Sequence, residues 1–198
     1  MALIDSWKNK NVFEKQLELN IKQLSNNYPQ HWMDFIKFII QEKPTSILDI
    51  GCGCGTYYEL CNREFNNIKY TGIDYSSDAI ELAKNKWNYE EFYVKDINEL
   101  SSDYINNFDM IHIGALLDVL PNGDDVLENM LKLSPKKLLI GRMEITDKPS
   151  YYETYDAYDE ITTYRYFHNK NNLIYLCEKY GYIINNIDNN YLFKEKNK

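Results

Sequence analysis

The chain has 198 residues, of which 44% are hydrophobic and 26% are charged, a composition typical of one globular domain with a hydrophobic core. Its formal net charge is −8 and its basic runs are no longer than a pair such as Lys136 and Lys137. We therefore expect no nucleic-acid partner, because binding phosphates requires clustered Lys and Arg. No segment approaches the roughly 20 apolar residues that cross a bilayer, and residues 1–10 lack the apolar core of a signal peptide. We expect a cytoplasmic protein without a membrane partner.

The four cysteines are Cys52, Cys54, Cys61 and Cys177. Their spacing matches neither a zinc site nor a disulfide framework. We therefore expect no metal, and we interpret Cys52 and Cys54 as small side chains tolerated beside glycines.

Two helices are predicted ahead of the first strand. Apolar residues recur at helical spacing between residues 12 and 24, and Asn26-Asn27-Tyr28 then breaks this pattern. A second amphipathic pattern begins at Pro29, a residue suited to the first turn of a helix, and ends near Lys43 and Pro44.

Residues 47–56, with the sequence ILDIGCGCGT, form the motif around which we interpret the chain. A short apolar strand leads into three glycines that alternate with small residues, and a helix is predicted over residues 56–64. Glycines allow a ligand to approach the main chain, and the first N–H groups of a helix suit an anionic group. A dinucleotide fingerprint would require glycine where the chain has Thr56, which argues against a nicotinamide oxidoreductase.

The acidic residue and the G-x-G-x-G spacing resemble the first motif of the class I S-adenosylmethionine-dependent methyltransferases. The resemblance implies that S-adenosylmethionine is the methyl donor and S-adenosylhomocysteine the product. It also implies that the cofactor site includes Asp49, Gly51, Gly53 and Gly55. A helical cap over residues 1–44 and a methyltransferase domain over residues 45–198 follow from the same resemblance. Whether the first helix is a lid over the cofactor or plain cover for a sheet face stays open.

The predicted second strand, residues 69–76, contains Asp74, which lies roughly 20 residues after the glycine turn. An acid at the tip of this strand is placed to accept hydrogen bonds from ribose hydroxyls. The alternative is a helix cap, but residues 76–78 already supply capping groups for a helix predicted over residues 79–87. In the family that the chain resembles, Tyr75 would stack on the adenine edge.

A third strand is predicted over residues 91–94, and Asp96 and Ile97 follow it. In the resembled family an acid at this point meets the adenine amino group, and the next apolar residue packs on the ring. The alternative for Asp96 is an ordinary loop aspartate.

The fourth predicted strand and its exit span residues 108–117, and we include Gly114 among the cofactor-binding residues. The family often continues with a glutamate-histidine pair, whereas this chain has Asp118 followed by Val119. The acid is kept as aspartate and the histidine is missing. His112 lies within the strand, and we interpret it as a core histidine.

A helix is predicted over residues 124–133 and a fifth strand over residues 137–145, after which the periodicity stops. We interpret residues 149–168 as an irregular, tyrosine-rich segment that binds the methyl acceptor. The proposed acceptor-binding residues are Tyr164 and Arg165, the latter through an acceptor carboxylate. The alternative is a surface flap whose aromatic residues cover the sheet edge.

A general base assists methyl transfer if the acceptor is a hydroxyl. The candidates are Asp118, Glu144 and His168, because each would lie near the carboxyl ends of the strands, where ligands of such sheets bind.

A last helix is predicted over residues 173–180, and strands over residues 182–187 and 191–194 form a hairpin. The expected fold is α/β and Rossmann-like: a doubly wound, mostly parallel seven-stranded sheet with an antiparallel C-terminal hairpin.

The sequence thus predicts a metal-independent enzyme that moves a methyl group to an oxygen or nitrogen of a small-molecule acceptor by in-line displacement. We expect a monomer or homodimer. The alternative is a non-catalytic, cofactor-binding or scaffolding protein with a methyltransferase fold.

Overall fold

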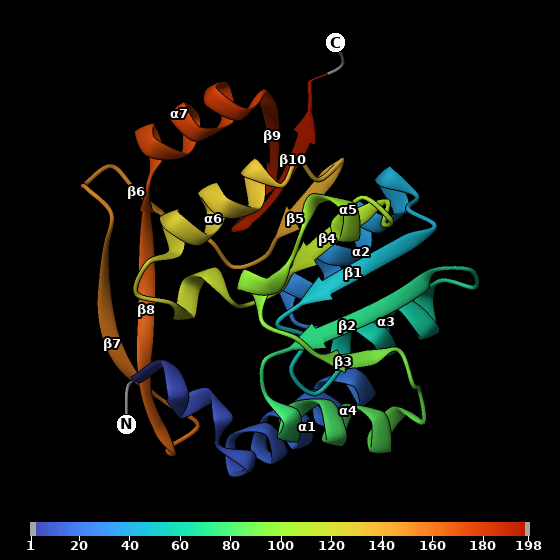
Figure 1. Ribbon diagram of the computed structural model, residues 1–198. Helices are drawn as coiled ribbons and strands as arrows, with labels where there is room; N and C mark the ends of the chain where they lie inside the picture. The colour runs from blue at the N-terminus through green and yellow to red at the C-terminus, as the bar shows by residue number, and fades with distance from the viewer. Residues whose placement is uncertain (1–2, 197–198) are drawn as a thin grey trace.

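The computed structural model describes residues 3–196, with side chains from Ser6 onward. Figure 1 shows a central sheet with helices on both faces and a smaller sheet to one side. The helices are α1 (Lys10–Ser25), α2 (Gln30–Glu42), α3 (Thr56–Glu64), α4 (Ser77–Trp87), α5 (Ser102–Ile105), α6 (Gly123–Lys132) and α7 (Lys170–Tyr180), with 3₁₀ turns η1 (Leu3–Lys8), η2 (Ile97–Glu99) and η3 (Leu117–Val119). The strands are β1 (Ser46–Ile50), β2 (Lys69–Asp74), β3 (Phe92–Val94), β4 (Met110–Ile113), β5 (Lys137–Ile140), β6 (Glu144–Thr146), β7 (Tyr151–Ala157), β8 (Ile161–Asn169), β9 (Tyr182–Ile187) and β10 (Asn190–Glu195).

The central sheet has seven strands in the order β3-β2-β1-β4-β5-β10-β9. The pairs from β3 to β5 are parallel, and β10 is antiparallel to both β5 and β9. The predicted mostly parallel sheet with an antiparallel C-terminal hairpin is therefore confirmed. The strand order reverses between β1 and β4, and in open α/β sheets a ligand crevice lies outside the carboxyl ends of the strands at this point.

Hydrophobic residues on both faces of β1 explain why helices cover the sheet on two sides. Leu48 and Ile50 belong to the core cluster shared with α6 and α7, whereas Ile47 packs in the cluster with α2, α3 and α4. In α2, Phe35 and Phe38 are almost completely buried, and burial of each such ring contributes about 1.5–3 kcal/mol. The second predicted helix is thus part of the core.

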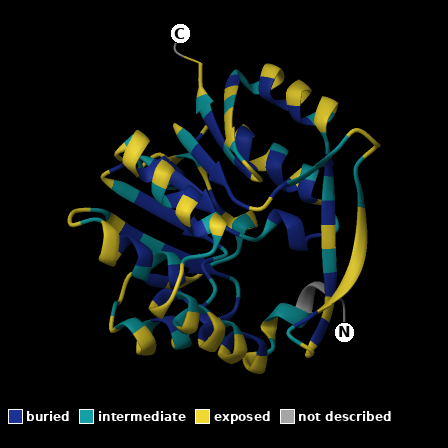
Figure 2. Cartoon of the chain, turned by 180° about the vertical axis from the view of Figure 1, so that it is seen from behind, coloured by how far each residue is buried: buried dark blue, intermediate teal, exposed yellow. Residues whose placement is uncertain are grey.

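The tyrosine-rich segment is a β-hairpin, so the prediction of an irregular segment over residues 149–168 is wrong. Strands β7 and β8 pair antiparallel, and β6 joins β8 to complete a second, three-stranded sheet. The connecting turn uses Tyr158 and Asp159 with φ of 57° and 56°, without the Asn or Gly that normally marks such a turn. Figure 2 shows β7 exposed along most of its length, so it also lacks the burial alternation of a core strand.

The predicted strand over residues 137–145 is in fact two strands in different sheets. The main chain leaves the central sheet after Ile140, and Arg142 adopts a left-handed conformation with φ of 62° before β6 begins. Within the predicted fourth strand and its exit, residues 108–117, strand β4 ends at Ile113 and the main chain then leads into η3. Both breaks lie at the carboxyl edge of the sheet, where the ligand crevice is expected.

None of the helices in the described part of the chain combines the length and the apolar character needed to cross a membrane.

Two glycines at helix ends allow the cost of a left-handed backbone to be separated from the cost of crowding. A methyl group on Gly55, which has φ of 74°, would lie 2.6 Å from Cζ of the buried Phe92, whereas nothing lies within 4 Å of a methyl group on Gly181, which has φ of 75°. We expect Gly181→Ala to lower the free energy of unfolding by about 1 kcal/mol. Gly55→Ala should lower it by about 2–4 kcal/mol, because overpacking adds to the backbone cost. Urea unfolding measures both free energies. Equal losses of stability in the two variants would show that the Phe92 side chain moves aside without an energetic penalty.

Candidate active site

A cavity of about 460 Å³ lies at the carboxyl ends of β1 and β2, beside the glycine turn. We call it the glycine-turn cavity. Its lining includes six of the predicted cofactor-binding residues: Gly51, Gly53, Asp74, Tyr75, Asp96 and Ile97. The opposite wall comes from the N-terminal segment, through Trp7 and Phe13, and from the β7–β8 hairpin, through residues 155–158. The volume lies in the range of small-molecule sites.

Asp74, the last residue of β2, is fixed by the main chain around it. Its Oδ2 atom accepts a hydrogen bond of 2.9 Å from the N–H of Gly53, and its Oδ1 atom accepts one of 2.9 Å from the N–H of Ser76. The side chain is buried, and this burial raises the pKa of its carboxyl to about 6. Asp74 therefore holds the glycine turn against the end of β2 and also forms part of the cavity wall.

Asp96 and Ile97 lie on the cavity wall at the end of β3. Asp96 also has the hydrogen bond of an ordinary loop aspartate, the alternative that the sequence left open. Its Oδ1 atom accepts a hydrogen bond of 2.8 Å from the N–H of Asn98 and so caps η2. A capping aspartate can still present its second oxygen to a ligand. Contact of Asp96 with the adenine amino group stays a prediction.

The other three predicted cofactor residues, Asp49, Gly55 and Gly114, support the site from outside the glycine-turn cavity. The carboxylate of Asp49 is buried beneath the turn, accepts a hydrogen bond from the hydroxyl of Tyr70, and lies 2.7 Å from Nδ1 of His112. A methyl group on Gly114 would lie 2.6 Å from the ring of Tyr57, and one on Gly55 would strike Phe92. These residues permit close packing of the elements that carry the turn.

The N-terminal segment is attached both to the glycine turn and to the hairpin. The amide of Asn20 on α1 donates to the hydroxyl of Thr56, the first residue of α3, at 2.7 Å. The indole N–H of Trp7 on η1 donates to the hydroxyl of Thr163 on β8 at 2.8 Å. Because Trp7 and Phe13 also line the cavity, these contacts favour a lid over plain cover.

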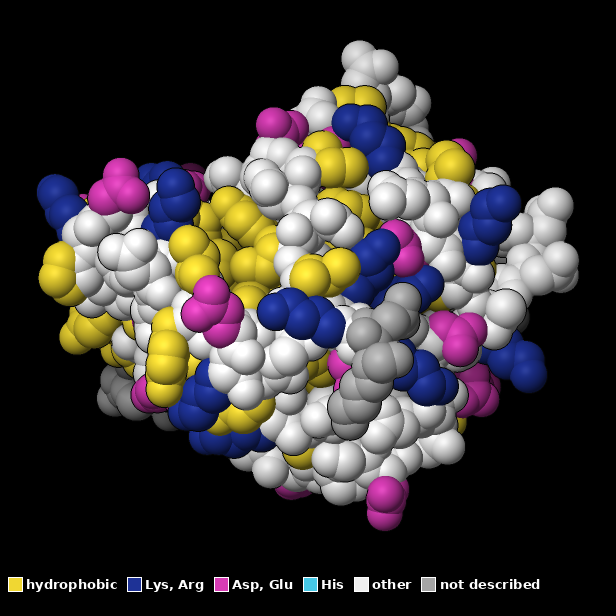
Figure 3. All heavy atoms as spheres, turned by 90° about the horizontal axis from the view of Figure 1, so that it is seen from above, with side chains coloured by type: hydrophobic (Ala, Val, Ile, Leu, Met, Phe, Trp, Pro, Cys, Tyr) yellow, Lys and Arg dark blue, Asp and Glu magenta, His cyan; other side chains and the backbone are white. Residues whose placement is uncertain are grey.

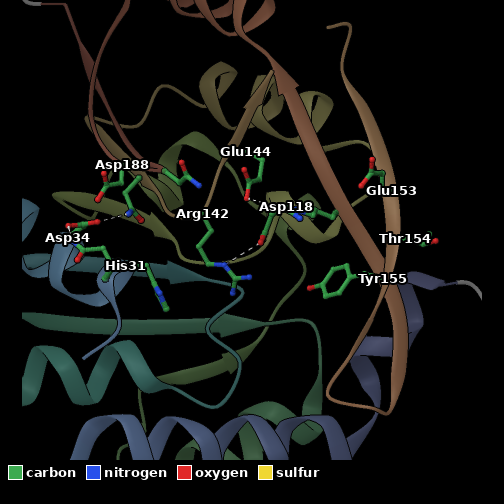
Figure 4. A pocket seen from close by; sticks show the side chains of 13 residues that line it. His31, Asp34, Asp118, Arg142, Glu144, Glu153, Thr154, Tyr155 and Asp188 are labelled. Atoms are coloured by element: carbon green, nitrogen blue, oxygen red, sulfur yellow. Dashed lines mark hydrogen bonds and ion pairs between the residues drawn. The ribbon is translucent and has the colours of Figure 1, made fainter. Parts of the chain in front are cut away.

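A second cavity, of about 620 Å³, has a mostly charged and polar wall, and we call it the polar cavity. Arg142 and Tyr155 line both cavities, so the two are neighbours. Figure 4 shows the Arg142 side chain between His31 of α2 on one side and Tyr155 of β7 on the other. The wall is completed by Gln30, Asp34, Asp118, Glu144, Glu153, Thr154, Arg165, Asp188, Asn189 and Asn190.

Asp118 is the buried acid of the polar cavity. Its Oδ2 atom lies 3.5 Å from Nε of Arg142, while its buried Oδ1 atom has no hydrogen-bond partner within residues 3–196. Burial raises the pKa of the Asp118 carboxyl, and the charge of Arg142 opposes this shift. An aspartate in this position can accept a proton or a hydrogen bond from a group that enters the cavity.

Glu144 and Arg165, two further predicted site residues, meet on the wall of the polar cavity. Nη2 of Arg165 lies 2.9 Å from Oε1 of Glu144, so the guanidinium already has a carboxylate partner. Tyr164, in contrast, packs against Tyr152 with ring centroids 5.0 Å apart and lies outside both cavities.

His168 does not reach either cavity. Its side chain is completely buried, with Nδ1 placed 2.7 Å from Oδ1 of Asp124, and Nε2 has no hydrogen-bond partner in the described part of the chain. The hairpin carries it toward α6 instead, because β8 ends beside the first turn of that helix. This geometry gives no support to His168 as the base that contacts an acceptor.

The site residues predicted from the sequence include Asp118, Glu144 and Arg165 of the polar cavity but not its other lining residues, among them His31, Arg142 and Asp188. His31 belongs to the second helix of the predicted N-terminal cap, to which no site residue was assigned, and Asp188 lies in the turn of the β9–β10 hairpin. A signal was available for Arg142, because the Gly141-Arg142 pair directly follows β5 at the carboxyl edge of the sheet.

A mostly parallel sheet, a glycine turn and a fixed acid at the edge where the strand order reverses together define a Rossmann-like domain built for a nucleotide-type cofactor. Among residues 3–196, no group of three or more His, Cys, Asp or Glu side chains is arranged to hold a metal ion.

Comparison with known proteins extends this assignment. Residues 41–181 match a family model described as a methyltransferase domain. A trans-aconitate 2-methyltransferase of Yersinia pseudotuberculosis is 29% identical over 120 residues, which cover 60% of this chain and 46% of that protein. The chain thus spans about half the length of the curated relatives that it matches.

Solved structures share the fold at low sequence identity. An S-adenosylmethionine-dependent methyltransferase from Clostridium acetobutylicum superimposes with a TM-score of 0.65 at 15% identity, over 93% of this chain and 99% of that one. The sugar N-methyltransferase KedS8 from Streptoalloteichus gives a TM-score of 0.62 at 10% identity, over 91% of this chain and 93% of that one. The chain therefore belongs to the methyltransferase-domain family, in the class I group whose cofactor is S-adenosylmethionine.

The raised pKa of Asp74 predicts a pH dependence of cofactor binding. The ionised carboxylate accepts hydrogen bonds from ribose hydroxyls more strongly than the protonated acid, so binding favours the ionised form. Affinity for S-adenosylhomocysteine should therefore be full above pH 6 and fall by about tenfold as the pH decreases through about 6. Calorimetric titration measures this profile. Asp74→Asn should bind more weakly at neutral pH and show a flat profile, and an unchanged affinity would contradict the ribose assignment.

The hydrogen bond between Trp7 and Thr163 predicts the kinetics of cofactor release. Thr163→Val keeps the shape of this buried side chain but removes the acceptor for the Trp7 indole, at a cost of about 1 kcal/mol in the closed arrangement. S-adenosylhomocysteine should dissociate about five times faster, as stopped-flow displacement would show. The control is Thr162→Val on the neighbouring, exposed position. Equal dissociation rates in the two variants would make the N-terminal segment plain cover.

Proposed function

We propose that this protein transfers the methyl group of S-adenosylmethionine to a nitrogen or oxygen of a small polar molecule, with the cofactor in the glycine-turn cavity and the acceptor in the polar cavity. The observation that carries the proposal is the sharing of Arg142 and Tyr155 by the two cavities. Groups held in neighbouring cavities can be aligned for direct transfer, which by orientation alone can supply about 7–11 kcal/mol in the best cases.

The residues of the glycine-turn cavity fit the chemistry of this cofactor. Asp74 offers a fixed, ionisable acceptor for ribose hydroxyls, and the apolar side chain of Ile97 offers a flat contact for adenine beside Asp96. The first N–H groups of α3, which follow Gly55, suit the cofactor carboxylate. When bound, S-adenosylmethionine supplies an activated methyl group on a sulfonium leaving group.

The protein's own contribution is to position the acceptor, exclude water and receive a proton. Trp7, Phe13 and the hairpin residues 155–158 close the glycine-turn cavity on the side away from the sheet, which restricts access of water. Asp118 is the proposed proton acceptor, because it is buried, lines the polar cavity and has one oxygen without a partner in the described residues. Glu144 is less suited, since Arg165 already pairs with it.

A small-molecule acceptor agrees with the names of similar proteins, which include a trans-aconitate and a sugar methyltransferase. On the face shown in Figure 3, Lys and Arg side chains are dispersed among Asp, Glu and uncharged side chains. We retain the expectation of no nucleic-acid partner, and of a monomer or homodimer, as parts of this proposal.

Asp118→Asn tests the proposed base. Because Asn cannot take up the proton, methyl transfer should fall by about 100-fold while the affinity for S-adenosylhomocysteine stays within about twofold. The assay follows labelled methyl from S-adenosylmethionine into a panel of small amines, alcohols and carboxylic acids, with calorimetry for cofactor binding. The control is Asp125→Asn on the exposed side of α6. Failure of the wild-type protein to bind S-adenosylhomocysteine would overturn the proposed function itself.

A further inference from the structure

Carboxylates outnumber cationic groups on the wall of the polar cavity. Five acidic side chains line it, namely Asp34, Asp118, Glu144, Glu153 and Asp188, against the two guanidinium groups of Arg142 and Arg165. His31 adds no charge at neutral pH, because burial and the nearby charge of Arg142 lower its pKa to about 4. The cavity is therefore acidic as a whole.

Both arginines already have carboxylate partners. Arg165 is 2.9 Å from Glu144, and Nε of Arg142 is 3.5 Å from Asp118. A carboxylate on the acceptor would have to share or displace one of these partners and would be repelled by the other acids that line the cavity. This arrangement argues against the role first predicted for Arg165, recognition of an acceptor carboxylate.

One of the five acids is committed to the fold. The buried carboxylate of Asp34 receives hydrogen bonds from Gln30 at 2.8 Å, from Lys37 at 2.8 Å and from Asn190 at 3.3 Å. These contacts join α2 to β10 and satisfy both carboxylate oxygens. Asp34 therefore shapes the cavity and is not needed for recognition.

Three acids remain able to receive a ligand. Glu153 on β7 and Asp188 in the β9–β10 turn are exposed, and neither forms an ion pair within the described residues. Figure 4 shows Asp188 and Glu153 on opposite sides of Asp118, so the turn and the strand β7 contribute to different parts of the cavity wall. The buried Oδ1 atom of Asp118 has no hydrogen-bond partner in residues 3–196. A buried acceptor of this kind calls for a donor on the molecule that fills the site.

We propose that the acceptor is an amine that carries a positive charge in solution, recognised by Glu153 and Asp188 and methylated on a nitrogen beside Asp118. This inference rests on the proposed function and narrows it to N-methylation. The ammonium group loses a proton to the Asp118 carboxylate, and its freed electron pair forms the new nitrogen–carbon bond. The carbon–sulfur bond breaks with its electron pair going to sulfur, and the products are the N-methylammonium compound and S-adenosylhomocysteine.

The same charge distribution favours capture of a cation from solution. The net charge of −8 makes the whole protein attractive to cations, and the acidic cavity focuses this attraction at the site. The attraction between exposed charges is screened beyond about 8–10 Å at physiological ionic strength. The apparent KM for an amine should therefore rise with salt.

Matched acceptors that differ mainly in charge test the proposal. The probes are glucosamine, glucose and glucuronate; putrescine, 1,4-butanediol and succinate; and benzylamine, benzyl alcohol and benzoate, with trans-aconitate added as a tricarboxylate. Transfer of labelled methyl from S-adenosylmethionine and thermal shifts of the protein saturated with S-adenosylhomocysteine are recorded for each. The amine should be the best substrate or ligand of its set, by at least about tenfold.

A variant that removes two negative charges tests whether Glu153 and Asp188 recognise the amine. Glu153→Gln combined with Asp188→Asn should raise KM for the amine by about tenfold, leave kcat within about twofold and leave the affinity for S-adenosylhomocysteine unchanged. The control is Glu81→Gln combined with Asp103→Asn, which removes two exposed acids from α4 and α5 and changes the net charge equally. It should behave like the wild type.

The outcomes separate this inference from the function on which it rests. Methylation of an alcohol or a carboxylic acid in preference to its amine would leave the methyltransferase function standing and overturn the amine assignment. Intact binding of S-adenosylhomocysteine, with no amine bound or methylated, would overturn it as well. Loss of amine recognition in the control variant would show that net charge, and not the polar cavity, provides the attraction.

Discussion

The buried carboxylate of Asp49 is the interaction on which the arrangement of the sheet and the site depends. It lies on β1 and binds Tyr70 of β2 and His112 of β4, the two strands that flank β1. The His112 ring in turn packs against Phe35 and Tyr57, with centroids 4.7 and 4.3 Å away. A buried acid with its partners in place fixes the geometry around it, because leaving such a group without a hydrogen-bond partner costs about 1–3 kcal/mol. Here it fixes the point where the strand order reverses.

The position of the glycine turn follows from this centre. The turn follows β1 one residue after Ile50, close to Asp49, and the N–H of Gly53 donates a hydrogen bond to Asp74 at the end of β2. Two aspartates from adjacent strands therefore have complementary roles. Asp49 holds the strands together from below, and Asp74 holds the turn from the side while facing the cavity. This edge of the sheet is thus built around two acidic side chains that form hydrogen bonds within the protein itself.

Much of this architecture could be predicted from the sequence. Buried parallel strands are short apolar runs, and the glycine turn marks the first of them, so the central sheet was recognisable. Asp74, Tyr75, Asp96 and Ile97 were traceable to the cavity because they follow strands whose carboxyl ends share one edge. Motif membership alone does not separate residues that line the cavity from residues beside it, so contact of Asp49, Gly55 and Gly114 with the cofactor stays a prediction.

The polar cavity could not be predicted in the same way, because its residues come from elements that are distant in sequence. His31 lies on α2, Arg142 follows β5, and Asp188 lies near the C-terminus. Arg142 has a positional signal because it follows a strand of the sheet, but no periodicity in the sequence indicates that the helix residue His31 and the turn residue Asp188 lie on the same cavity. The β7–β8 hairpin was missed for a local reason: Tyr158 and Asp159 adopt positive φ without glycine or asparagine.

The two ends of the β7–β8 hairpin line different cavities. Residues 153–155 of β7 face the polar cavity, whereas residues 155–158 face the glycine-turn cavity, next to the anchor for Trp7. Strand pairing places Glu153 opposite Arg165 and Tyr155 opposite Thr163. In the proposed function, the half of the hairpin near residues 151–154 and 164–167 lies toward the acceptor, whereas the half near residues 155–163 encloses the cofactor. Under that proposal one strand pair serves two sites, and we expect chimeras that join hairpins at Tyr155 and Thr163 to exchange acceptor preference as a unit.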